Sequence, residues 1–471
     1  MLLKRFYDAG LAQASYLIGC QATGESIVVD PNRDVEQYVR AAADEGVKIT
    51  HVTETHIHAD FVSGSRELAA RAGAQLLLSD EGGADWSYAF AETDGARLLK
   101  DGDTIRVGKV RLDVHHTPGH TPEHLSFIVT DSAATDRPMG VLTGDFLFVG
   151  DVGRPDLLER AAKIAGTMDA SSRALYHSVQ RFKQLQDYLQ LWPGHGAGSA
   201  CGKSLGAVPS TTLGYERLAN WALTAPNEEA FVADVLAGQP DPPRYFAQMK
   251  RINRDGPRVL GGVARVPRLD DSQLESVLRN GRLVVDTRSA VVFASGHVPG
   301  TINLPLNRNF TTWAGSLLPY DQDFLLIADG APDDAVRALR MIGLERVSGW
   351  FGTSAVEAWR SAGHAIGVTQ QLSPADLDKL MQAGAVEVVD VRDPSEWSAS
   401  HLPRVANLPL GQLPDRLAEL PRDRPIAVHC QGGGRSAIAA SVLRANGFAN
   451  VSNVPGGFGA WVTEGRPVEH E

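Results

Sequence analysis

Short apolar runs alternate with stretches of helical periodicity along the first part of the chain. Ser26–Val29 and Ile49–Thr53 are rich in β-branched residues, and polar or turn-forming residues follow each of them. Gly64–Arg71 has the pattern of a helix, and Ala74–Leu78 is strand-like again. Strands interleaved with helices predict a layered α/β domain, which we expect over residues 1–255.

The apolar pattern of the C-terminal part is duplicated. Val284–Arg288 matches Val388–Arg392, and other pairs of residues match at the same sequence offset. These pairs are His297 with His401, Asn303–Leu306 with Asn407–Leu410, and Gly343 with Gly447. Each copy alternates predicted strands and helices, as in a small doubly wound parallel sheet. We therefore expect two similar domains, over residues 256–366 and 367–471.

Composition and charge narrow the classes of function. The chain has 471 residues, 43% hydrophobic and 21% charged, which is ordinary for a globular protein. No apolar run approaches about 18 residues, so we expect no membrane span. Asp and Glu number 56 against 45 Lys and Arg, and this net charge of −11 argues against a nucleic-acid binder. Only three cysteines are present, so we expect a reducing, cytoplasmic setting, with a homo-oligomer as the general expectation for soluble proteins.

Four loops of the first predicted domain each present histidine or aspartate after a strand-like run. The segments are Thr55–Asp60, His115–Thr121, Leu142–Phe146 and Trp192–Gly196. Open α/β sheets bind their ligands in loops of this kind. Imidazole nitrogens and carboxylate oxygens gathered there are a donor set for a metal ion.

These segments, together with Asp30-Pro31, resemble the metallo-β-lactamase fold, an αββα sandwich, over the first predicted domain. Hydrolases of that family usually carry H-x-H-x-D-H and bind two metal ions. Phe61 stands here in place of the last histidine, which removes a ligand from the second metal position. We therefore expect one metal ion.

Within that family, Thr55–Asp60, Thr117–Thr121 and Thr143–Asp145 are similar to the persulfide dioxygenases. The resemblance implies one Fe(II) per chain, because those enzymes bind one through two histidines and one aspartate. The ligands implied by motif position are His56, His120 and Asp145. Such a face leaves coordination positions open for substrate sulfur and O₂.

The remaining polar residues of these loops are expected to support the metal. His58 and Asp60 would orient ligands or bound water by hydrogen bonds, and His195 would line the cavity. Gly150–Asp156 is similar to the family's Gly-Arg-x-Asp substrate segment, in which Arg154 could clamp a carboxylate; a solvated loop arginine is the alternative. Cys201 could accept sulfane sulfur or could pack as a small buried residue.

A cysteine stands between a predicted strand and a predicted helix near the C-terminus. Pro425–His429 is a buried-type strand, and Cys430 follows it. Converging backbone N–H groups and the helix dipole favour a thiolate there. Arg435 adds a positive charge for an anionic substrate. The other expected substrate-binding residues of this loop are Gly432, Gly433, Gly434 and Ser436.

The spacing C-x-x-G-x-R resembles the active loop of rhodanese sulfurtransferases, which carry sulfane sulfur as a cysteine persulfide. Asp390–Asp393 and Pro455–Trp461 extend the resemblance, whereas Ser400–Arg404 departs from the family's usual Gly-His-Ile-Pro-Gly. In the first copy the strand Phe324–Ala328 leads to Asp329 and no cysteine, so we expect that copy to be an inactive structural or docking module.

The order of domains resembles the bacterial fusions of persulfide dioxygenase with rhodanese that act in sulfide detoxification. It implies that O₂ oxidises a persulfide of glutathione, coenzyme A, bacillithiol or cysteine to sulfite and the free thiol. Sulfane-sulfur transfer at Cys430 would then make or consume thiosulfate. The alternatives are a glyoxalase II-type metallo-hydrolase fused to a rhodanese, with zinc or two metal ions, and a sulfur carrier without a metal.

Overall fold

The computed structural model describes residues 1–162, 166–239, 241–262 and 265–470. The chain divides into two compact units: Met1–Val263 with Arg340–Gly343, and Ala264–Leu339 with Leu344–Glu471. In the described ranges, none of the helices combines the length and the hydropathy needed to span a bilayer.

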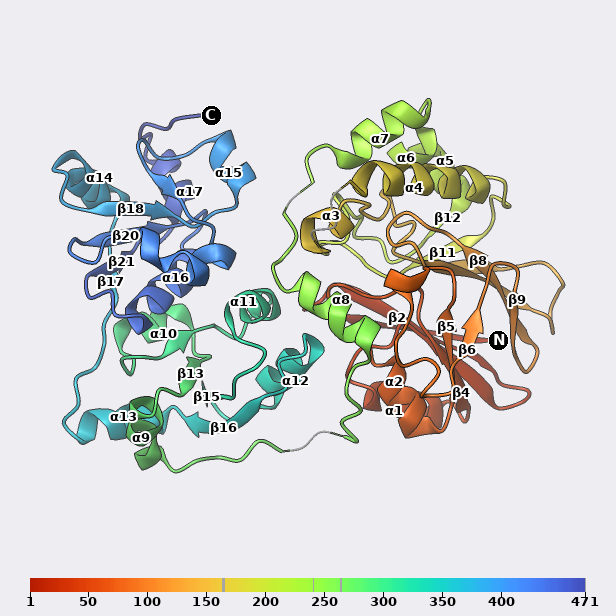
Figure 1. Ribbon diagram of the computed structural model, residues 1–471, viewed down its shortest axis with the longest axis horizontal. Helices are drawn as coiled ribbons and strands as arrows, with labels where there is room; N and C mark the ends of the chain where they lie inside the picture. The colour runs from red at the N-terminus through yellow and green to blue at the C-terminus, as the bar shows by residue number, and fades with distance from the viewer. Residues whose placement is uncertain (163–165, 240, 263–264, 471) are drawn as a thin grey trace. The chain divides into compact units, whose positions relative to one another are not determined.

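Two six-stranded sheets form the centre of the first unit (Figure 1). The first sheet follows chain order, antiparallel among its first three strands and parallel thereafter. Its strands are β1 (Leu2–Asp8), β2 (Gln13–Cys20), β3 (Glu25–Val29), β4 (Lys48–Thr53), β5 (Gln75–Ser79) and β6 (Arg97–Leu99). The second sheet has the order β12-β11-β10-β9-β8-β7, with only β10 and β11 parallel. Its strands are β7 (Thr104–Val107), β8 (Val110–His116), β9 (Leu125–Asp131), β10 (Gly140–Gly144), β11 (Gln190–Pro193) and β12 (Thr211–Thr212).

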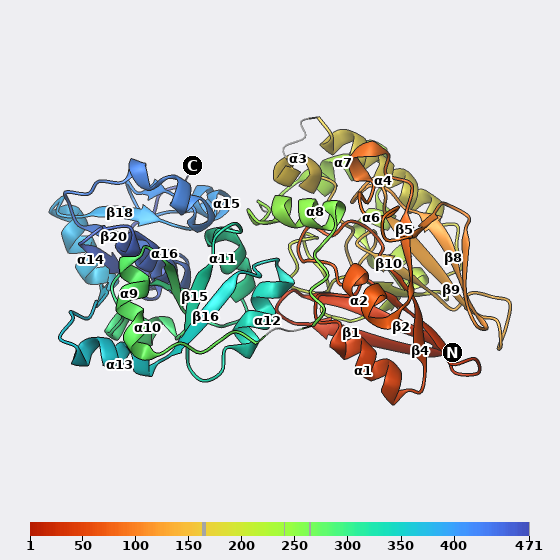
Figure 2. The same ribbon diagram turned by 60° about the horizontal axis from the view of Figure 1, so that its bottom comes forward.

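Helices cover the outer faces of both sheets, and an apolar core lies between the sheets. Along β2, Ile18 packs into the core shared by the two sheets, whereas its neighbour Leu17 packs against the first group of helices. On the first sheet lie α1 (Glu36–Asp44), α2 (Ser65–Ala72) and the short η1 (Ala84–Trp86), as Figure 2 shows for α1 and α2. On the second lie α4 (Met168–Phe182), α5 (Leu213–Ala219), α6 (Trp221–Thr224) and α7 (Glu228–Leu236). The remaining helices of this unit are α3 (Leu157–Ala162) and α8 (Phe246–Asp255). The predicted αββα sandwich is confirmed.

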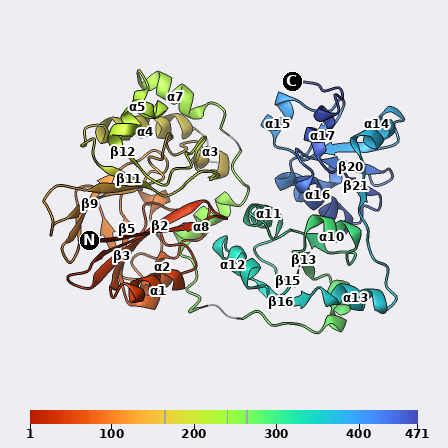
Figure 3. The same cartoon turned by 180° about the vertical axis from the view of Figure 1, so that it is seen from behind.

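The second unit contains two parallel sheets, one for each predicted copy. The first has the order β14-β13-β15-β16 and the second the order β17-β21-β20-β18-β19. The first copy contains η2 (Asp271–Gln273), α9 (Leu274–Arg279), β13 (Leu283–Asp286), α10 (Ala290–Ser295), β14 (Ile302–Asn303), α11 (Phe310–Leu317), β15 (Phe324–Ala328), α12 (Asp333–Met341), β16 (Val347–Gly352) and α13 (Ser354–Ser361). The second contains β17 (Gln370–Gln371), α14 (Pro374–Gln382), β18 (Glu387–Asp390), α15 (Pro394–Ala399), β19 (Ala406–Asn407), η3 (Leu410–Asp415), η4 (Leu417–Glu419), β20 (Ile426–His429), α16 (Gly434–Ala445), β21 (Val451–Asn453) and α17 (Gly457–Thr463). Figure 3 shows α16 beside β20 and β21.

Residues that repeat in the sequence make equivalent hydrogen bonds in the two copies. The side-chain amide of Asn303 donates to the carbonyl oxygens of Asp286 and Arg288. Asn407 donates in the same way to Asp390 and Arg392, and so fixes the connection after the first strand of its sheet. The repeat in sequence therefore corresponds to a repeat in fold. The exact domain boundaries, at 255/256 and 366/367, stay predictions.

Candidate active sites

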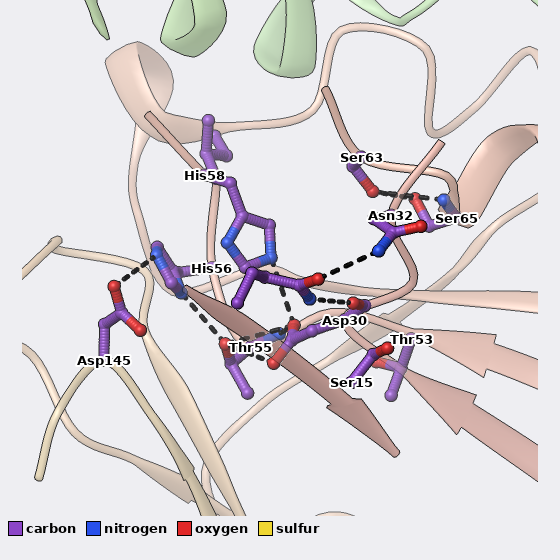
Figure 4. Close-up of polar contacts among 12 residues, drawn as sticks. Ser15, Asp30, Asn32, Thr53, Thr55, His56, His58, Ser63, Ser65 and Asp145 are labelled. Atoms are coloured by element: carbon purple, nitrogen blue, oxygen red, sulfur yellow. Dashed lines mark hydrogen bonds and ion pairs between the residues drawn. The ribbon is translucent and has the colours of Figure 1, made fainter. Parts of the chain in front are cut away.

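A buried aspartate shapes the loop that follows β4. Asp30 comes directly after β3 with a left-handed backbone (φ 52°), and its carboxylate accepts hydrogen bonds from the N–H of Thr55 (2.6 Å) and from Thr55 Oγ1 (3.0 Å). The same carboxylate lies 3.2 Å from His58 Nε2. Figure 4 shows Thr55 and His58 directed towards Asp30. Although burial acts to lower it, Asp30 raises the pKa of His58 to about 8, so the pair is ionic.

The three predicted ligands converge on one point. His56 Nε2 and His120 Nε2 lie 3.8 and 3.6 Å from Asp145 Oδ2, and all three side chains are buried. Each can direct one ligand atom to a common position, with these atoms within 4.8 Å of one another. His56 Nε2 and Asp145 Oδ2 have no hydrogen-bond partner among the described residues. Buried polar atoms left in this way are unfavourable unless something binds them, so the set fits a metal ion.

Hydrogen bonds hold both histidines in the tautomer that a metal needs. His120 Nδ1 donates to the carbonyl oxygen of Arg154 (3.1 Å), which leaves the lone pair on Nε2. His56 Nδ1 contacts Thr55 Oγ1 at 2.9 Å and leaves its own Nε2 facing the cluster. Burial lowers the pKa of both rings and keeps them neutral. Burial acts to raise the pKa of Asp145, but His195 and the other histidines outweigh it and hold that pKa well below its usual range.

His195 bridges two carboxylates beside this cluster. Its Nδ1 lies 2.7 Å from Asp145 Oδ1 and its Nε2 lies 2.8 Å from Asp60 Oδ2. Both carboxylates accept, so both ring nitrogens donate. Although burial opposes them, Asp145 and Asp60 raise the pKa of His195 well above its usual value. His195 thus contacts the cluster through Asp145, and its supporting role beside a metal ion stays a prediction.

A second group of donor atoms adjoins the first. Asp60, His195 and Cys201 are all buried, and their ligand atoms also lie within 4.8 Å of one another. Burial and the neighbouring carboxylates raise the pKa of the Cys201 thiol well above its usual value. Phe61, the residue that replaces a family histidine, is buried with its ring centroid 4.4 Å from that of His58. Asp60, His195 and Cys201 are therefore a second candidate donor set beside the first.

Arg154 is fully buried and already engaged. Its Nε and Nη2 donate to the two oxygens of Asp156 at 3.0 and 2.8 Å, and its Nη1 donates to the carbonyl oxygen of Ala200 at 3.2 Å. Its backbone N–H donates to the carbonyl of Cys201. Arg154 is not the solvated loop residue considered as an alternative. A clamp on substrate stays a prediction, and it would require the pair with Asp156 to open.

Motif reasoning did not identify His124 and Glu123. His124 Nε2 accepts from the N–H of Asp145 (3.1 Å), and Nδ1 contacts Thr117 Oγ1 (2.9 Å). Glu123 is also buried, and one of its oxygens accepts from the N–H of Ile57 (2.7 Å), within the metal loop. Burial raises the pKa of Glu123 to about 7. The sequence feature that could have identified His124 is its position four residues after His120.

The predicted nucleophile lies where β20 meets α16. Cys430 is buried, and its Sγ accepts hydrogen bonds from the N–H of Gly433 (3.1 Å) and from Ser436 Oγ (3.5 Å). Gly433 has φ 92°, a conformation that glycine adopts without strain. Gly432 and Gly434 are exposed on the same turn, and α16 begins at Gly434. This arrangement can stabilise a thiolate or a persulfide anion.

The Pro-Gly-Gly-Phe segment forms the support of the cysteine loop. The N–H of Phe458 donates to the carbonyl oxygen of Cys430 (2.7 Å), and that of Gly459 donates to Gln431 (3.0 Å). A Cβ at Gly457 would lie 1.9 Å from the Cys430 carbonyl oxygen. The motif therefore permits a close backbone approach that positions the nucleophile.

In the copy without a nucleophile, the two central strands of the sheet pair in the same register as in the active copy. Asp286 pairs in register with Ile327, and Asp390 pairs in register with His429. Ala328 therefore takes the place of Cys430, in agreement with the sequence-based assignment of this copy as the one lacking a nucleophile.

Comparisons with known proteins support both halves of this description. The family described as "Metallo-beta-lactamase superfamily" matches residues 9–195, and the family described as "Rhodanese-like domain" matches residues 373–464. A crystal structure of a metallo-beta-lactamase from Staphylococcus aureus superposes with a TM-score of 0.67 at 42% identity, and covers 75% of this chain and 99% of that one.

Two curated relatives of the first unit have different activities. The mitochondrial persulfide dioxygenase of Bos taurus is 27% identical over 234 residues, which are 49% of this chain and 78% of the bovine protein. The hydroxyacylglutathione hydrolase of a Polaromonas species is 33% identical over 198 residues, which are 41% of this chain and 66% of that protein. Identity alone does not separate an oxygenase from a hydrolase here.

Proposed function

Because the chain belongs to the metallo-β-lactamase superfamily and ends in a rhodanese-like domain, we propose that it is a persulfide dioxygenase and sulfurtransferase. The first unit would oxidise a low-molecular-weight persulfide with O₂ to sulfite and the free thiol, and the Cys430 site would transfer sulfane sulfur. The observation that carries the proposal is the set His56, His120 and Asp145, with two of its buried atoms unpartnered among the described residues.

These three residues would hold one Fe(II), since two imidazoles and a carboxylate on one face suit non-haem iron. When bound, the iron would supply the activation of O₂. The chain itself would orient the metal ligands and exclude water from the site. Thr55, Arg154 and His124 fix the directions of the ligands, and the buried ring of Phe61 packs against His58. Exclusion of water would protect the persulfide while it is oxidised.

At the second site the Cys430 thiolate would attack the outer sulfur of a donor. A bond forms between Sγ and that sulfur, the S–S bond of the donor breaks, and the electron pair leaves on the donor thiolate. Sulfite from the first reaction can accept the carried sulfur as thiosulfate, and the reverse reaction consumes thiosulfate. The hydrogen bonds from Gly433 and Ser436 stabilise the anionic sulfur in both directions.

A pair of substitutions separates the two activities. His120→Ala should abolish oxygen uptake with glutathione persulfide and leave thiosulfate sulfurtransfer intact. Cys430→Ser should do the reverse. Equal loss of both activities in either variant would contradict two independent sites. An unchanged oxygen uptake in His120→Ala would refute the assignment of the ligands.

The second candidate is a glyoxalase II-type thioester hydrolase with two metal ions. The group Asp60, His195 and Cys201 favours it, because it offers donors for a second ion. The hydrogen bonds of His195 to Asp145 and Asp60 argue against it, because they occupy both ring nitrogens. A cytoplasmic location and a homo-oligomeric state stay predictions. Both alternatives for Cys201, sulfur acceptance and packing, stay open, as do the four alternatives for the thiol.

A further inference from the structure

The arginine of the cysteine loop is neutralised by acidic residues. Arg435 Nη1 and Nη2 donate to the two oxygens of Glu396 at 2.6 and 2.7 Å, and Nη1 also lies 3.4 Å from Asp393 Oδ2. The side chains of Arg435 and Glu396 are 18% and 32% exposed. Burial acts to raise the pKa of Glu396, but Arg435 outweighs it and lowers that pKa, so the carboxylate is charged. The pair is therefore a bidentate ion pair beside the nucleophile.

The other arginine near the loop is neutralised as well. Arg392 is buried, donates to both oxygens of Asp390 at 2.7 to 3.1 Å, and lies over the ring of Phe458 at 4.0 Å. Carboxylates therefore pair with both guanidinium groups. The donors that contact the Cys430 sulfur in the described residues are the N–H of Gly433 and Ser436 Oγ.

We propose that Glu396 determines the donor specificity of the Cys430 site by holding Arg435 away from substrate. The site then favours persulfide donors with at most one negative charge on the reacting sulfurs, and it binds the dianion thiosulfate weakly. This inference rests on the proposed sulfurtransferase function. Because Glu396 occupies Arg435, thiosulfate must displace Glu396 to reach the guanidinium. Glu396 would therefore also speed the release of thiosulfate when thiosulfate is the product.

The chemistry of the two donors differs only in the leaving group. With a persulfide, Sγ of Cys430 takes the outer sulfur and a thiolate leaves. With thiosulfate, Sγ takes the outer sulfur and sulfite leaves as a dianion. Only the second donor brings a sulfonate that needs a guanidinium, so the pair of Arg435 and Glu396 acts on that donor selectively.

Glu396→Gln tests this with little structural change. Glu396 also accepts the backbone N–H of Asp393 (3.1 Å) as part of the capping box of α15, and a glutamine oxygen can accept the same bond. The control is Asp378→Asn, which removes a carboxylate from the pair of Asp378 with Arg466, where the two side chains are 26% and 18% exposed.

The assay measures kcat and KM with thiosulfate and with the persulfide of 2-mercaptoethanol, whose only charge is on the persulfide. Glu396→Gln should lower the KM for thiosulfate by about tenfold, the size expected for one charge near a protein surface, and should change the KM for the persulfide far less. Asp378→Asn should change neither. The effect should vanish when Arg435→Gln is added, because the released guanidinium is then missing.

The outcomes separate this inference from the proposed function. If Glu396→Gln shifts both donors equally, or shifts neither while wild type transfers sulfur, the specificity role is wrong and the sulfurtransferase assignment stands. If wild type transfers sulfur from neither donor, the sulfurtransferase assignment itself fails.

Discussion

His124 Nε2 accepts a hydrogen bond from the backbone N–H of Asp145, 3.1 Å away, while its ring stacks on His56 with the centroids 5.1 Å apart. A backbone N–H only donates, so Nε2 is unprotonated and the ring proton is on Nδ1. Burial lowers the pKa of His124 well below its usual value and keeps it in this neutral form. One side chain therefore contacts two of the three proposed ligands.

We predict that His124→Ala weakens metal binding about 10- to 100-fold, the usual cost of removing a residue that orients ligands. The measurement is the metal retained after dialysis against a chelator of graded strength. His115→Ala is the control, because His115 is half-buried on β8 and belongs to neither donor group. Equal retention in all three proteins would show that His124 only packs.

Arg154→Met should destabilise the first unit. Breaking a buried ion pair costs up to about 3–5 kcal/mol. Asp156 is 1% exposed but keeps a second ion pair with Arg160 (3.2 Å), so we expect a loss below that range. Urea unfolding measures this loss. A substrate clamp predicts in addition a raised KM for glutathione persulfide, whereas a purely structural role predicts an unchanged KM, so the KM decides between the roles of Arg154.

Gly457→Ala should abolish sulfurtransfer without affecting oxygen uptake. The new Cβ would meet the Cys430 carbonyl oxygen at 1.9 Å, so the loop must move. Gly465→Ala isolates the backbone cost, because Gly465 also has a positive φ (69°) but has no atom within 4 Å of an added Cβ. If both variants lose activity equally, strain rather than displacement of Cys430 is the cause.

His429 should make the rhodanese-like domain sensitive to acid. Burial lowers its pKa from 6.5 to about 4, so the unfolded chain takes up the proton first as the pH falls. Its contribution to stability is complete above pH 6.5 and is lost between pH 6.5 and 4, by at most roughly 3 kcal/mol. His429→Ile, which copies Ile327 of the other sheet, should remove this dependence. Hydrogen exchange of the β20 amides in the full chain, at pH 7 and pH 5, measures the difference; parallel behaviour of the two proteins would contradict it.

The loops that carry the ligands could be predicted because they follow strand-like runs, whereas the choice of His56, His120 and Asp145 within those loops came from the resemblance to the persulfide dioxygenases. β4 precedes His56 and β10 precedes Asp145, and both strands are visible as short hydrophobic runs. The fold of the duplicated part could be predicted for a similar reason: Asn303 and Asn407 repeat because each ties down the same connection.

The supporting contacts could not be predicted, because they join residues that no motif links. Asp30 holds Thr55 across 25 positions, and His124 holds Asp145 across 21. Arg435 had the sequence context of an anion-binding cation, and its partner Glu396 lies 39 positions earlier on α15. Such pairs depend on how helices and loops pack, which hydrophobic patterning does not specify.

The proposed oxygenase activity is tested most directly by counting metal and following oxygen in the same preparation. Protein loaded anaerobically with Fe(II) should contain one iron per chain and should consume O₂ when glutathione persulfide is added, with sulfite as the product. It should not hydrolyse a glutathione thioester. Two metal ions per chain with thioester hydrolysis and no oxygen uptake would contradict the proposal and favour the hydrolase instead.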